Sequence, residues 1–283
     1  MATIIDGKLV SASVKAEIKE AVAKLSQKNI TVTLAVILVG DNAASQVYVN
    51  NKKKTCEELG IISKSFILPE SYGQENLLKL IEELNNDATI NGILCQLPLP
   101  DNYNEQAIIE AINPIKDVDA FHPVNVGCIV TGDYTFLPCT PAGIMKMLDY
   151  YNIDINGKNC VVVGRSNIVG KPMSLLLLHK NGTVTICHSK TKNLVEVCQQ
   201  ADILVAAVGK PKFITENMVK EGAVVIDVGI NRVDGKLVGD VDFENTKDKC
   251  SFITPVPGGV GPMTIAMLMA NTVTAAKIQN KVN

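Results

Sequence analysis

The chain has 283 residues, of which 47% are hydrophobic, and its formal net charge at pH 7 is -2. This composition excludes a disordered chain and a protein that binds nucleic acid through excess positive charge, and no uncharged apolar run is long enough to span a membrane. The length suits two domains of ordinary size, each with its own hydrophobic core.

The eight cysteines do not follow the spacing of a metal site or of a disulfide framework. None belongs to a C-x-x-C pair and most lie inside apolar runs, which is typical of buried, reduced thiols. The three histidines have no second histidine or carboxylate pair nearby, so we expect no metal. The first residues lack a basic flank followed by an apolar core, which favours a cytoplasmic location.

The first half of the chain alternates expected helices and strands. Apolar residues recur at helical spacing over residues 8–28, and residues 33–40 read as a buried strand. Asp41 and Asn42 form a turn that can cap the next helix, residues 43–59. The alternation continues with strands at 61–68 and 92–95 and helices at 74–85 and 104–112. This half is therefore expected to form an α/β domain of its own.

Turn-forming residues gather without a clear period between residues 113 and 141. An irregular segment of this length in a compact chain is more often a functional surface than a linker. A helix is then expected from Thr140 through Tyr150, with Pro141 in the first turn, where proline is tolerated. This helix leads into the second domain.

The second domain is organised around residues 160–172. Cys160–Val163 predict a strand buried on both faces, and Gly164 then opens a polar loop that leads into a helix. The unpartnered amides and the dipole at the start of such a helix favour an anion such as a phosphate. Only Gly164 and Gly170 bracket the loop, which is not the G-x-G-x-x-G spacing, so the interpretation depends on the strands that follow.

Further β-rich runs follow at residues 183–188, 201–209 and 223–229. Their alternation with helix-sized segments predicts a Rossmann-like, doubly wound parallel sheet with ligands at the carboxyl ends of its strands. NAD-binding sheets usually carry an acidic residue where this chain has His188–Lys192, which with Arg165 offers cations and a hydroxyl to an extra phosphate. The pattern therefore favours NADP over NAD, although ordinary solvated charges also fit these residues.

The end of the chain holds a loop rich in glycine and proline, residues 254–264, whose backbone a ligand can approach closely. The last helix is expected from Thr264 to about Ile278 and is expected to pack on the first domain. The predicted domains are therefore residues 1–140 with 264–283, and residues 141–263.

Tyr48 and Lys52 lie four residues apart on an expected helix and so share one face. A lysine beside an aromatic wall and near a dinucleotide loses solvation of its charged form, so its pKa should fall and it can exchange protons near neutral pH. From spacing alone, a solvated face of three lysines with Tyr48 half-buried in a core is the more common arrangement.

Two further polar residues are candidates. Gln96 follows the strand at 92–95, where its amide can hold a lysine and a water in register, although a glutamine at a strand end is often a backbone cap. Asp119 offers two acceptor oxygens to a ligand edge with adjacent N–H donors, and an aspartate that bonds its own turn is equally consistent with the sequence.

Seven motifs in chain order together resemble the bifunctional methylenetetrahydrofolate dehydrogenase/methenyltetrahydrofolate cyclohydrolase family. They lie at Gly40–Lys52, Gln96–Pro100, Lys116–Asp119, Pro138–Pro141, Val163–Pro172, Cys187–Ser189 and Pro255–Thr264. The resemblance covers nearly the whole chain. It implies two α/β domains flanking a cleft, with NADP on the second domain, tetrahydrofolate derivatives between the domains, and a homodimer.

The resemblance also implies two reactions. In the first, 5,10-methylenetetrahydrofolate is oxidised to 5,10-methenyltetrahydrofolate with NADP, and in the second the product is hydrolysed to 10-formyltetrahydrofolate. Both belong to one-carbon metabolism, which serves purine, methionine and histidine biosynthesis. Hydride transfer needs alignment and no enzyme acid or base if the folate nitrogen expels the hydride, whereas hydrolysis needs a base for the attacking water.

Matching positions carry the roles of the family. Lys52 would be the key catalytic residue, Tyr48 would stack on the aminobenzoyl group, Gln96 would tune Lys52, and Asp119 would hold the pterin. The residues that would meet the cofactor are Arg165 and Ser189 at the 2′-phosphate and Gly164, Ser166 and Ile230 in the cofactor cleft. Those that would border folate and nicotinamide are Thr140 and the Pro257–Pro262 loop, including Pro257, Gly258 and Gly259.

One residue departs from the family pattern, since Ala120 stands where the family commonly has glycine, and the local backbone must accept its Cβ. Two other functions remain open at this point. A dehydrogenase of the amino-acid or shikimate type would share the domain order but ignore methylenetetrahydrofolate. A non-catalytic sensor would bind NADP without turnover, which the set of Tyr48, Lys52, Gln96 and Asp119 disfavours.

Overall fold

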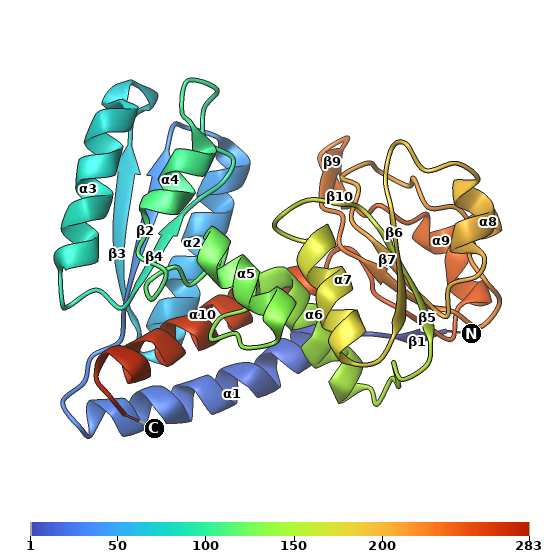
Figure 1. Cartoon of the computed structure of the whole chain (residues 1–283), viewed down its shortest axis with the longest axis horizontal. Coiled ribbons are helices and arrows are strands. Elements are labelled where there is room, and N and C mark those ends of the chain that lie inside the picture. Colours follow the sequence, from blue (N-terminus) through green and yellow to red (C-terminus); the bar gives the residue numbers. More distant parts are fainter. Residues whose placement is uncertain (1, 283) are drawn as a thin grey trace. The chain divides into compact units, whose positions relative to one another are not determined.

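The computed structural model describes residues 2–282, apart from the side chain of Ala44, so residues 1 and 283 of the predicted domain ranges lie outside the described residues. The chain divides into two compact units (Figure 1), which are described separately. Unit 1 holds the N-terminal segment through Ala12, Ile129–Asp133 and Pro138–Thr264. Unit 2 holds Ser13–Cys128, Tyr134–Leu137 and the segment from Ile265 onward.

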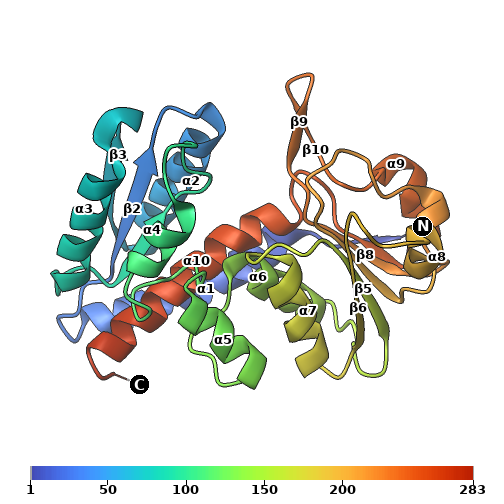
Figure 2. The ribbon, with the colours of Figure 1, turned by 45° about the horizontal axis from the view of Figure 1, so that its top comes forward.

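Unit 2 contains a three-stranded parallel sheet in the order β3-β2-β4. Its strands are β2 (Thr33–Val39), β3 (Ile62–Leu68) and β4 (Gly92–Cys95). Its helices are α2 (Ala43–Leu59), α3 (Gln74–Asn86) and α4 (Glu105–Ala111), with α2 and α3 on opposite faces of the sheet (Figures 1 and 2). Every residue of β2 is buried, as a central strand covered on both faces requires.

Unit 1 contains a six-stranded parallel sheet in the order β1-β11-β8-β7-β5-β6. The strands are β1 (Thr3–Ile4), β5 (Asn159–Val163), β6 (Thr183–Cys187), β7 (Ile203–Ala206), β8 (Val224–Asp227) and β11 (Phe252–Ile253). Its helices are α6 (Cys139–Tyr150), α7 (Gly170–His179), α8 (Leu194–Cys198) and α9 (Phe243–Thr246). The remaining strands, β9 (Asn231–Val233) and β10 (Lys236–Val238), form an antiparallel hairpin.

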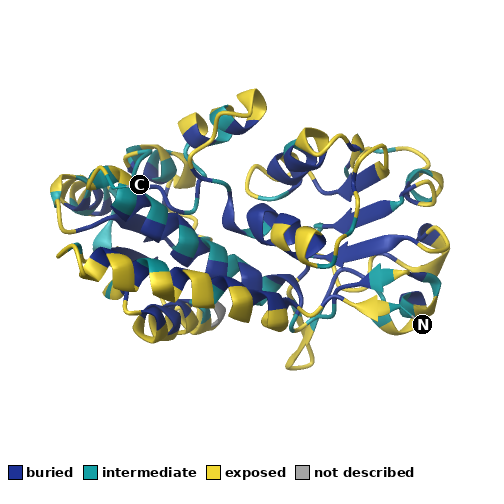
Figure 3. Cartoon of the chain, turned by 90° about the horizontal axis from the view of Figure 1, so that it is seen from below, coloured by how far each residue is buried: buried dark blue, intermediate teal, exposed yellow. Residues whose placement is uncertain are grey.

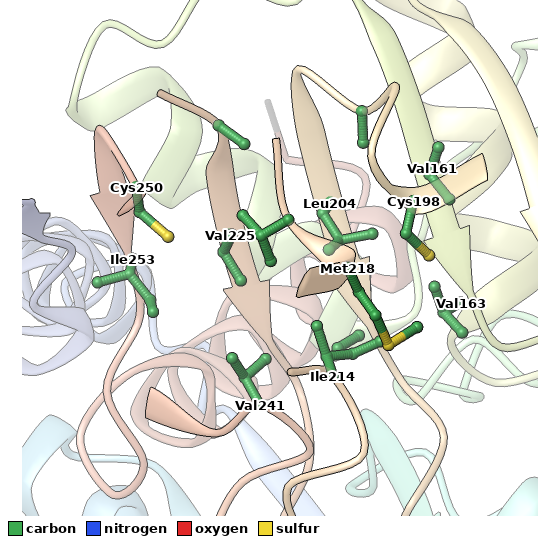
Figure 4. Close-up of a cluster of buried hydrophobic side chains, with 14 of the residues drawn as sticks. Val161, Val163, Cys198, Leu204, Ile214, Met218, Val225, Val241, Cys250 and Ile253 are labelled. Atoms are coloured by element: carbon green, nitrogen blue, oxygen red, sulfur yellow. The ribbon is translucent and has the colours of Figure 1, made fainter. Parts of the chain in front are cut away.

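One apolar core of unit 1 lies on a face of this sheet (Figure 4). Val161, Leu204 and Val225 project from three neighbouring strands and contact side chains from the segments that cover them, including Cys198, Ile214, Met218 and Val241. Strands β7 and β8 are buried along their whole length, and β5 is buried from Cys160 onward. Figure 3 shows such strands in dark blue, whereas several helices have a buried and an exposed side. Burial on both faces explains their continuous β-branched runs.

The chain has three further α-helices, α1 (Gly7–Ser26), α5 (Pro123–Thr131) and α10 (Val260–Gln279). The residues of α10 from Ile265 belong to unit 2, where Asn271 Nδ2 donates to the carbonyl oxygens of Val118 at 2.8 Å and Leu137 at 2.9 Å. Within residues 2–282, no helix combines the length and the apolar composition that crossing a membrane requires.

The predicted fold class is confirmed: both units are α/β, and the six-stranded sheet is parallel and Rossmann-like. The prediction of an irregular segment over 113–141 was wrong in part, because α5 occupies its centre with Pro123 at the start, where proline costs no hydrogen bond. The last helix begins at Val260 rather than Thr264, so the second half of the predicted loop is helical. The β9-β10 hairpin was not predicted.

Candidate active site

The helix α2 carries one buried lysine. Its N-terminus is capped by Asn42, whose side chain accepts a hydrogen bond from the Ser45 N–H at 3.0 Å, as the sequence predicted. Lys52 lies on the same helical face as Tyr48 and is only 8% exposed, whereas Lys53 and Lys54 are exposed. The structure therefore separates Lys52 from a solvated row of lysines.

Gln96 holds the amine of Lys52. The Lys52 Nζ donates to Gln96 Oε1 at 2.9 Å. The other end of the same amide donates from Nε2 to the carbonyl oxygen of Leu97 at 2.6 Å, and the backbone N–H of Gln96 donates to the Ile37 carbonyl at 2.8 Å, which extends the pairing of β4 with β2. Because both ends of the amide are engaged, its oxygen has a defined direction toward the lysine.

The segment that carries Asp119 is anchored by the two residues that begin the motif. Lys116 is buried and its Nζ donates to the carbonyl oxygens of Leu84 at 3.0 Å and Asp87 at 2.8 Å, and burial lowers its pKa. Asp117 is also buried, and its Oδ2 accepts from the N–H of His122 at 2.8 Å and from Asn125 Nδ2 at 2.9 Å. Burial raises the pKa of Asp117 despite these bonds. The side chains of Lys116 and Asp117 therefore fix the backbone of the segment that carries Asp119.

Asp119 is half-buried and precedes Ala120, which is fully buried with φ at +60°. This is the left-handed region that favours glycine, so the chain accepts a Cβ at the position where the family commonly has none. Burial raises the pKa of Cys95 to about 12, and the negative charges of Glu105 and Asp119 add to this effect. The Asp119 carboxylate therefore lies within electrostatic reach of the end of β4, where Gln96 follows.

The loop between β5 and α7 is tightly folded. Gly164 has φ at +143°, and a Cβ there would overlap the carbonyl oxygen of Ala207. A Cβ on Gly170 would overlap the carbonyl oxygen of Gly164. The Ser166 hydroxyl accepts from the N–H groups of Val169 at 3.2 Å and Gly170 at 3.3 Å. A loop that excludes side chains at both glycines, before the start of a helix, fits the phosphates of a dinucleotide.

Arg165 and Ser189 leave neighbouring strands at the same edge of the sheet. Val163 pairs with Cys187 in the β5-β6 register, and the Gly164 N–H donates to the Cys187 carbonyl at 2.9 Å. Both Arg165 and Ser189 are exposed, so their donors are available to a ligand at this edge. A guanidinium and a hydroxyl at the same edge of a sheet suit a phosphate monoester.

The other predicted site residues of unit 1 lie at helix starts and loops. Thr140 Oγ1 and Thr264 Oγ1 are 2.9 Å apart, so the starts of α6 and α10 meet there. Gly258 has φ at +105° and its carbonyl accepts from the Gly7 N–H at 3.0 Å, while Pro257 is exposed and Gly259 is buried. Ile230 follows β8 and is 44% exposed. The structure thus gathers Tyr48, Lys52, Gln96 and Asp119 in unit 2 and the remaining predicted residues in unit 1.

The sequence reasoning missed two buried carboxylates of unit 1, Asp227 at the end of β8 and Asp240 after β10. A signal existed for Asp227, because a charged residue that ends a run of apolar strand residues is unusual. Nothing in the sequence pointed to Asp240 as buried.

Two family models match the chain. The tetrahydrofolate dehydrogenase/cyclohydrolase catalytic domain matches residues 5–119, and the tetrahydrofolate dehydrogenase/cyclohydrolase NAD(P)-binding domain matches residues 138–280. Among curated proteins, the bifunctional protein FolD of Agathobacter rectalis is 62% identical over 278 residues, which are 98% of this chain and 100% of that protein.

Solved structures agree with these matches. The bifunctional FolD methylenetetrahydrofolate dehydrogenase/cyclohydrolase of Campylobacter jejuni is 54% identical, covers 100% of both chains and has a TM-score of 0.97. The N5,N10-methylenetetrahydrofolate dehydrogenase-cyclohydrolase of Trypanosoma brucei, solved with NADP cofactor and inhibitor, is 37% identical, covers 99% of both chains and has a TM-score of 0.95.

Proposed function

Because the chain belongs to the tetrahydrofolate dehydrogenase/cyclohydrolase family, we propose that Lys52, Tyr48, Gln96 and Asp119 carry its folate chemistry. The enzyme is bifunctional and NADP-dependent: it oxidises 5,10-methylenetetrahydrofolate to 5,10-methenyltetrahydrofolate and hydrolyses this product to 10-formyltetrahydrofolate. A dehydrogenase of the amino-acid or shikimate type is not favoured, since both matching family models are tetrahydrofolate models.

In the oxidation, the protein aligns the folate substrate with NADP. Bound NADP supplies the acceptor for the hydride that leaves the folate. The Gly164–Gly170 turn and the start of α7 would hold its phosphates, and Arg165 and Ser189 would take the 2′-phosphate. Ser166 and Ile230 would line the cofactor, and Thr140, Pro257, Gly258 and Gly259 would border folate and nicotinamide. No acid or base is required of these residues.

Hydrolysis requires a base, which we assign to Lys52. As a water oxygen bonds to the methenyl carbon, one water proton passes to the Lys52 Nζ. The bond from that carbon to N5 then breaks, the remaining hydroxyl proton passes to N5, and the formyl group stays on N10. The amine must be neutral to accept that proton, and its burial disfavours the charged form. Gln96 accepts one N–H of the amine at 2.9 Å, which leaves the nitrogen lone pair directed away from the glutamine.

Tyr48 and Asp119 would hold the substrate. Tyr48 lies one helical turn before Lys52 and would stack on the aminobenzoyl group, while the Asp119 carboxylate would accept from adjacent N–H groups of the pterin. The observation that carries the proposal is the hydrogen bond from a buried Lys52 to Gln96.

The test follows both activities in one preparation of purified protein. Methylenetetrahydrofolate and NADP are mixed with the enzyme, and the absorbances of NADPH and of the methenyl product are recorded together. Loss of the methenyl signal after NADPH has formed measures hydrolysis. NADPH formation without subsequent decay of the methenyl species would contradict the role of this site in hydrolysis.

We further propose a homodimer in the cytoplasm that serves purine, methionine and histidine biosynthesis. The strand β6 is an edge of the six-stranded sheet, and its Ile186 is 42% exposed, so an edge is available for pairing between subunits. Light scattering on the purified protein measures the mass directly. All eight cysteines are thiols and seven of them are buried, which suits a reducing compartment, and cell fractionation tests that location.

A further inference from the structure

Asp240 is a fully buried carboxylate that accepts four hydrogen bonds. Its Oδ2 accepts from the backbone N–H groups of Val208 at 2.6 Å and Gly209 at 2.9 Å. Its Oδ1 accepts from the backbone N–H of Lys210 and from Asn231 Nδ2, both at 2.9 Å. An ionised carboxylate is an acceptor with about four lone-pair positions, so all of its capacity is used.

These donors come from two loops at the carboxyl edge of the parallel sheet. Val208–Lys210 follow β7, and Gly209 has φ at +66°, so three consecutive N–H groups converge on one point, an arrangement that binds anions. Asn231 is the first residue of β9 and follows Ile230 in the loop after β8. Asp240 therefore ties the loop after β7 to the loop after β8.

A second carboxylate holds Asp240 in place. Asp227 Oδ1 accepts from the N–H groups of Gly229 at 2.9 Å and Asp240 at 2.8 Å, and its Oδ2 accepts from the Val241 N–H at 2.9 Å. A Cβ on Gly229 would overlap Asp240, and a Cβ on Gly239 would overlap Asp227. Both glycines thus provide the space that the two carboxylates occupy.

The loop held by Asp240 contacts the loop that we assign to NADP. In the sheet, β5 lies between β6 and β7, so the chain order reverses at β5, and ligands of such sheets bind outside the carboxyl ends at this point. Gly164, at the end of β5, is so close to Ala207 that a side chain would overlap the Ala207 carbonyl. A shift of the loop after β7 would therefore change the shape of the cofactor loop.

We propose that Asp240 is a positioning residue for the dehydrogenase reaction: by gathering the amides of Val208–Lys210 and the side chain of Asn231, it fixes the loops after β7 and β8 around the nicotinamide half of NADP. This inference rests on the proposed NADP-binding role of the Gly164 loop and Ile230. Hydrolysis of the methenyl substrate consumes no cofactor, so it does not depend on these loops. Asp240 thus serves one of the two activities.

The test compares Asp240→Asn with Asp202→Asn. Asparagine keeps the shape of the side chain but turns an N–H₂ group toward N–H donors, which removes about half of the acceptor capacity. Asp202 also accepts a backbone N–H, from Asn159 at 2.9 Å, but it precedes β7 at the opposite edge of the sheet. The measurements are the Kd of NADP by titration, the dehydrogenase kcat and KM, and hydrolysis of methenyltetrahydrofolate without NADP.

We expect Asp240→Asn to raise the Kd and KM of NADP about tenfold to a hundredfold, the range that loss of one or two buried hydrogen bonds produces. NAD binding should weaken by the same factor, because Asp240 bonds the loops after β7 and β8, whereas the proposed 2′-phosphate residues follow β5 and β6. Hydrolysis should change less than about twofold, and Asp202→Asn should leave all constants near those of the parent. Unchanged NADP binding, or equal loss of both activities, would overturn the proposal.

Asn231→Ala keeps the proposal testable if Asp240→Asn does not fold, because it removes one donor from a partly exposed position. It should weaken NADP in the same direction by a smaller factor, with hydrolysis intact, and no change would contradict the proposal. Arg165→Ala distinguishes failure of the positioning role of Asp240 from failure of the proposed NADP site. If Arg165→Ala weakens NADP and Asp240→Asn does not, only the positioning role fails, and if neither does, the assignment of the cofactor site fails.

Discussion

The Nζ of Lys52, on α2, lies 2.9 Å from the Oε1 of Gln96, at the end of β4. One partner comes from a helix and the other from a strand end, and the glutamine amide is fixed at its other end by the Leu97 carbonyl at 2.6 Å. The acceptor that Gln96 offers to this buried amine is neutral. An amide does not stabilise the ammonium as a carboxylate would, so the arrangement suits an amine that must be able to lose its proton.

Replacing Lys52 by Met should abolish hydrolysis and leave NADP binding intact. A general base contributes about a hundredfold to ten-thousandfold to a rate, so cyclohydrolase activity should fall by at least about a hundredfold. The predicted cofactor residues all belong to unit 1, whereas Lys52 belongs to unit 2, so the Kd of NADP should stay within about twofold. Lys53→Met is the matched control, since its side chain is exposed. Unchanged hydrolysis in Lys52→Met would remove Lys52 from the mechanism.

Replacing Gln96 by Glu should move the pH–rate profile of hydrolysis. A carboxylate at the position of the amide favours the charged form of Lys52, so more alkaline solution is needed to obtain the neutral amine. Activity at pH 7 should fall about tenfold for each unit by which the rising limb moves to higher pH. Gln96→Ala loses the hydrogen bond without adding charge, so its rate should fall without that upward movement. If both variants keep the parent profile, Gln96 does not act through Lys52.

Replacing Arg165 by Ala should weaken NADP much more than NAD. A charge-assisted hydrogen bond contributes about 1.5–3 kcal/mol, so the Kd of NADP should rise about tenfold to a hundredfold while that of NAD changes little. Lys158→Ala provides a control for loss of a cation, because Lys158 is exposed and precedes β5, at the opposite edge of the sheet. Equal losses for both cofactors in titrations would count against contact with the 2′-phosphate.

Periodicity predicted most of the fold, and the exceptions have local causes. The apolar runs of β2, β5, β7 and β8 and the helical spacing of α1 and α3 correspond to observed elements. The strand β1 has only two residues, too few for any period, and it exists because it pairs with β11. The β9-β10 hairpin did carry a signal in the sequence, which is the pair Asp234-Gly235 between the two strands. Both residues have positive φ in the structure, as an Asp-Gly hairpin turn requires.

The site could be predicted only as a set of residue types. Spacing placed Tyr48 and Lys52 on one face, but it could not show that Lys52 is buried while Lys53 and Lys54 are exposed. The hydrogen bond to Gln96 joins residues 44 apart in sequence, so no local pattern encodes it. Asp240 was missed for the same reason, since its donors lie on two loops that only the sheet brings together.

Asp227 should give the protein a distinctive pH dependence. Burial is the main effect, and it raises the pKa of Asp227 from 3.8 to about 6. Backbone hydrogen bonds from Val241, Asp240 and Gly229 lower the pKa by less than burial raises it, and the negative charge of Asp240 raises it further. The folded state therefore binds this proton more tightly than the unfolded state. Between about pH 4 and pH 6 the folded protein carries the proton and the unfolded chain does not, so the contribution of Asp227 to the free energy of unfolding falls as pH rises.

The measurement is urea unfolding of the parent and of Asp227→Asn at several pH values from 4 to 7. Asparagine cannot titrate, so the stability of the parent relative to the variant should decline across this window, by up to about 3 kcal/mol for a shift of this size. Any fixed cost of the asparagine is the same at each pH and does not affect the trend. Asp202→Asn is the control and should show almost no trend from pH 4 to 7, because hydrogen bonds from Lys220 and Asn159 lower the pKa of Asp202, so its contribution is lost only as pH falls below about 4. A difference between the parent and Asp227→Asn that is flat from pH 4 to 7 would mean that Asp227 is ionised throughout in the folded protein.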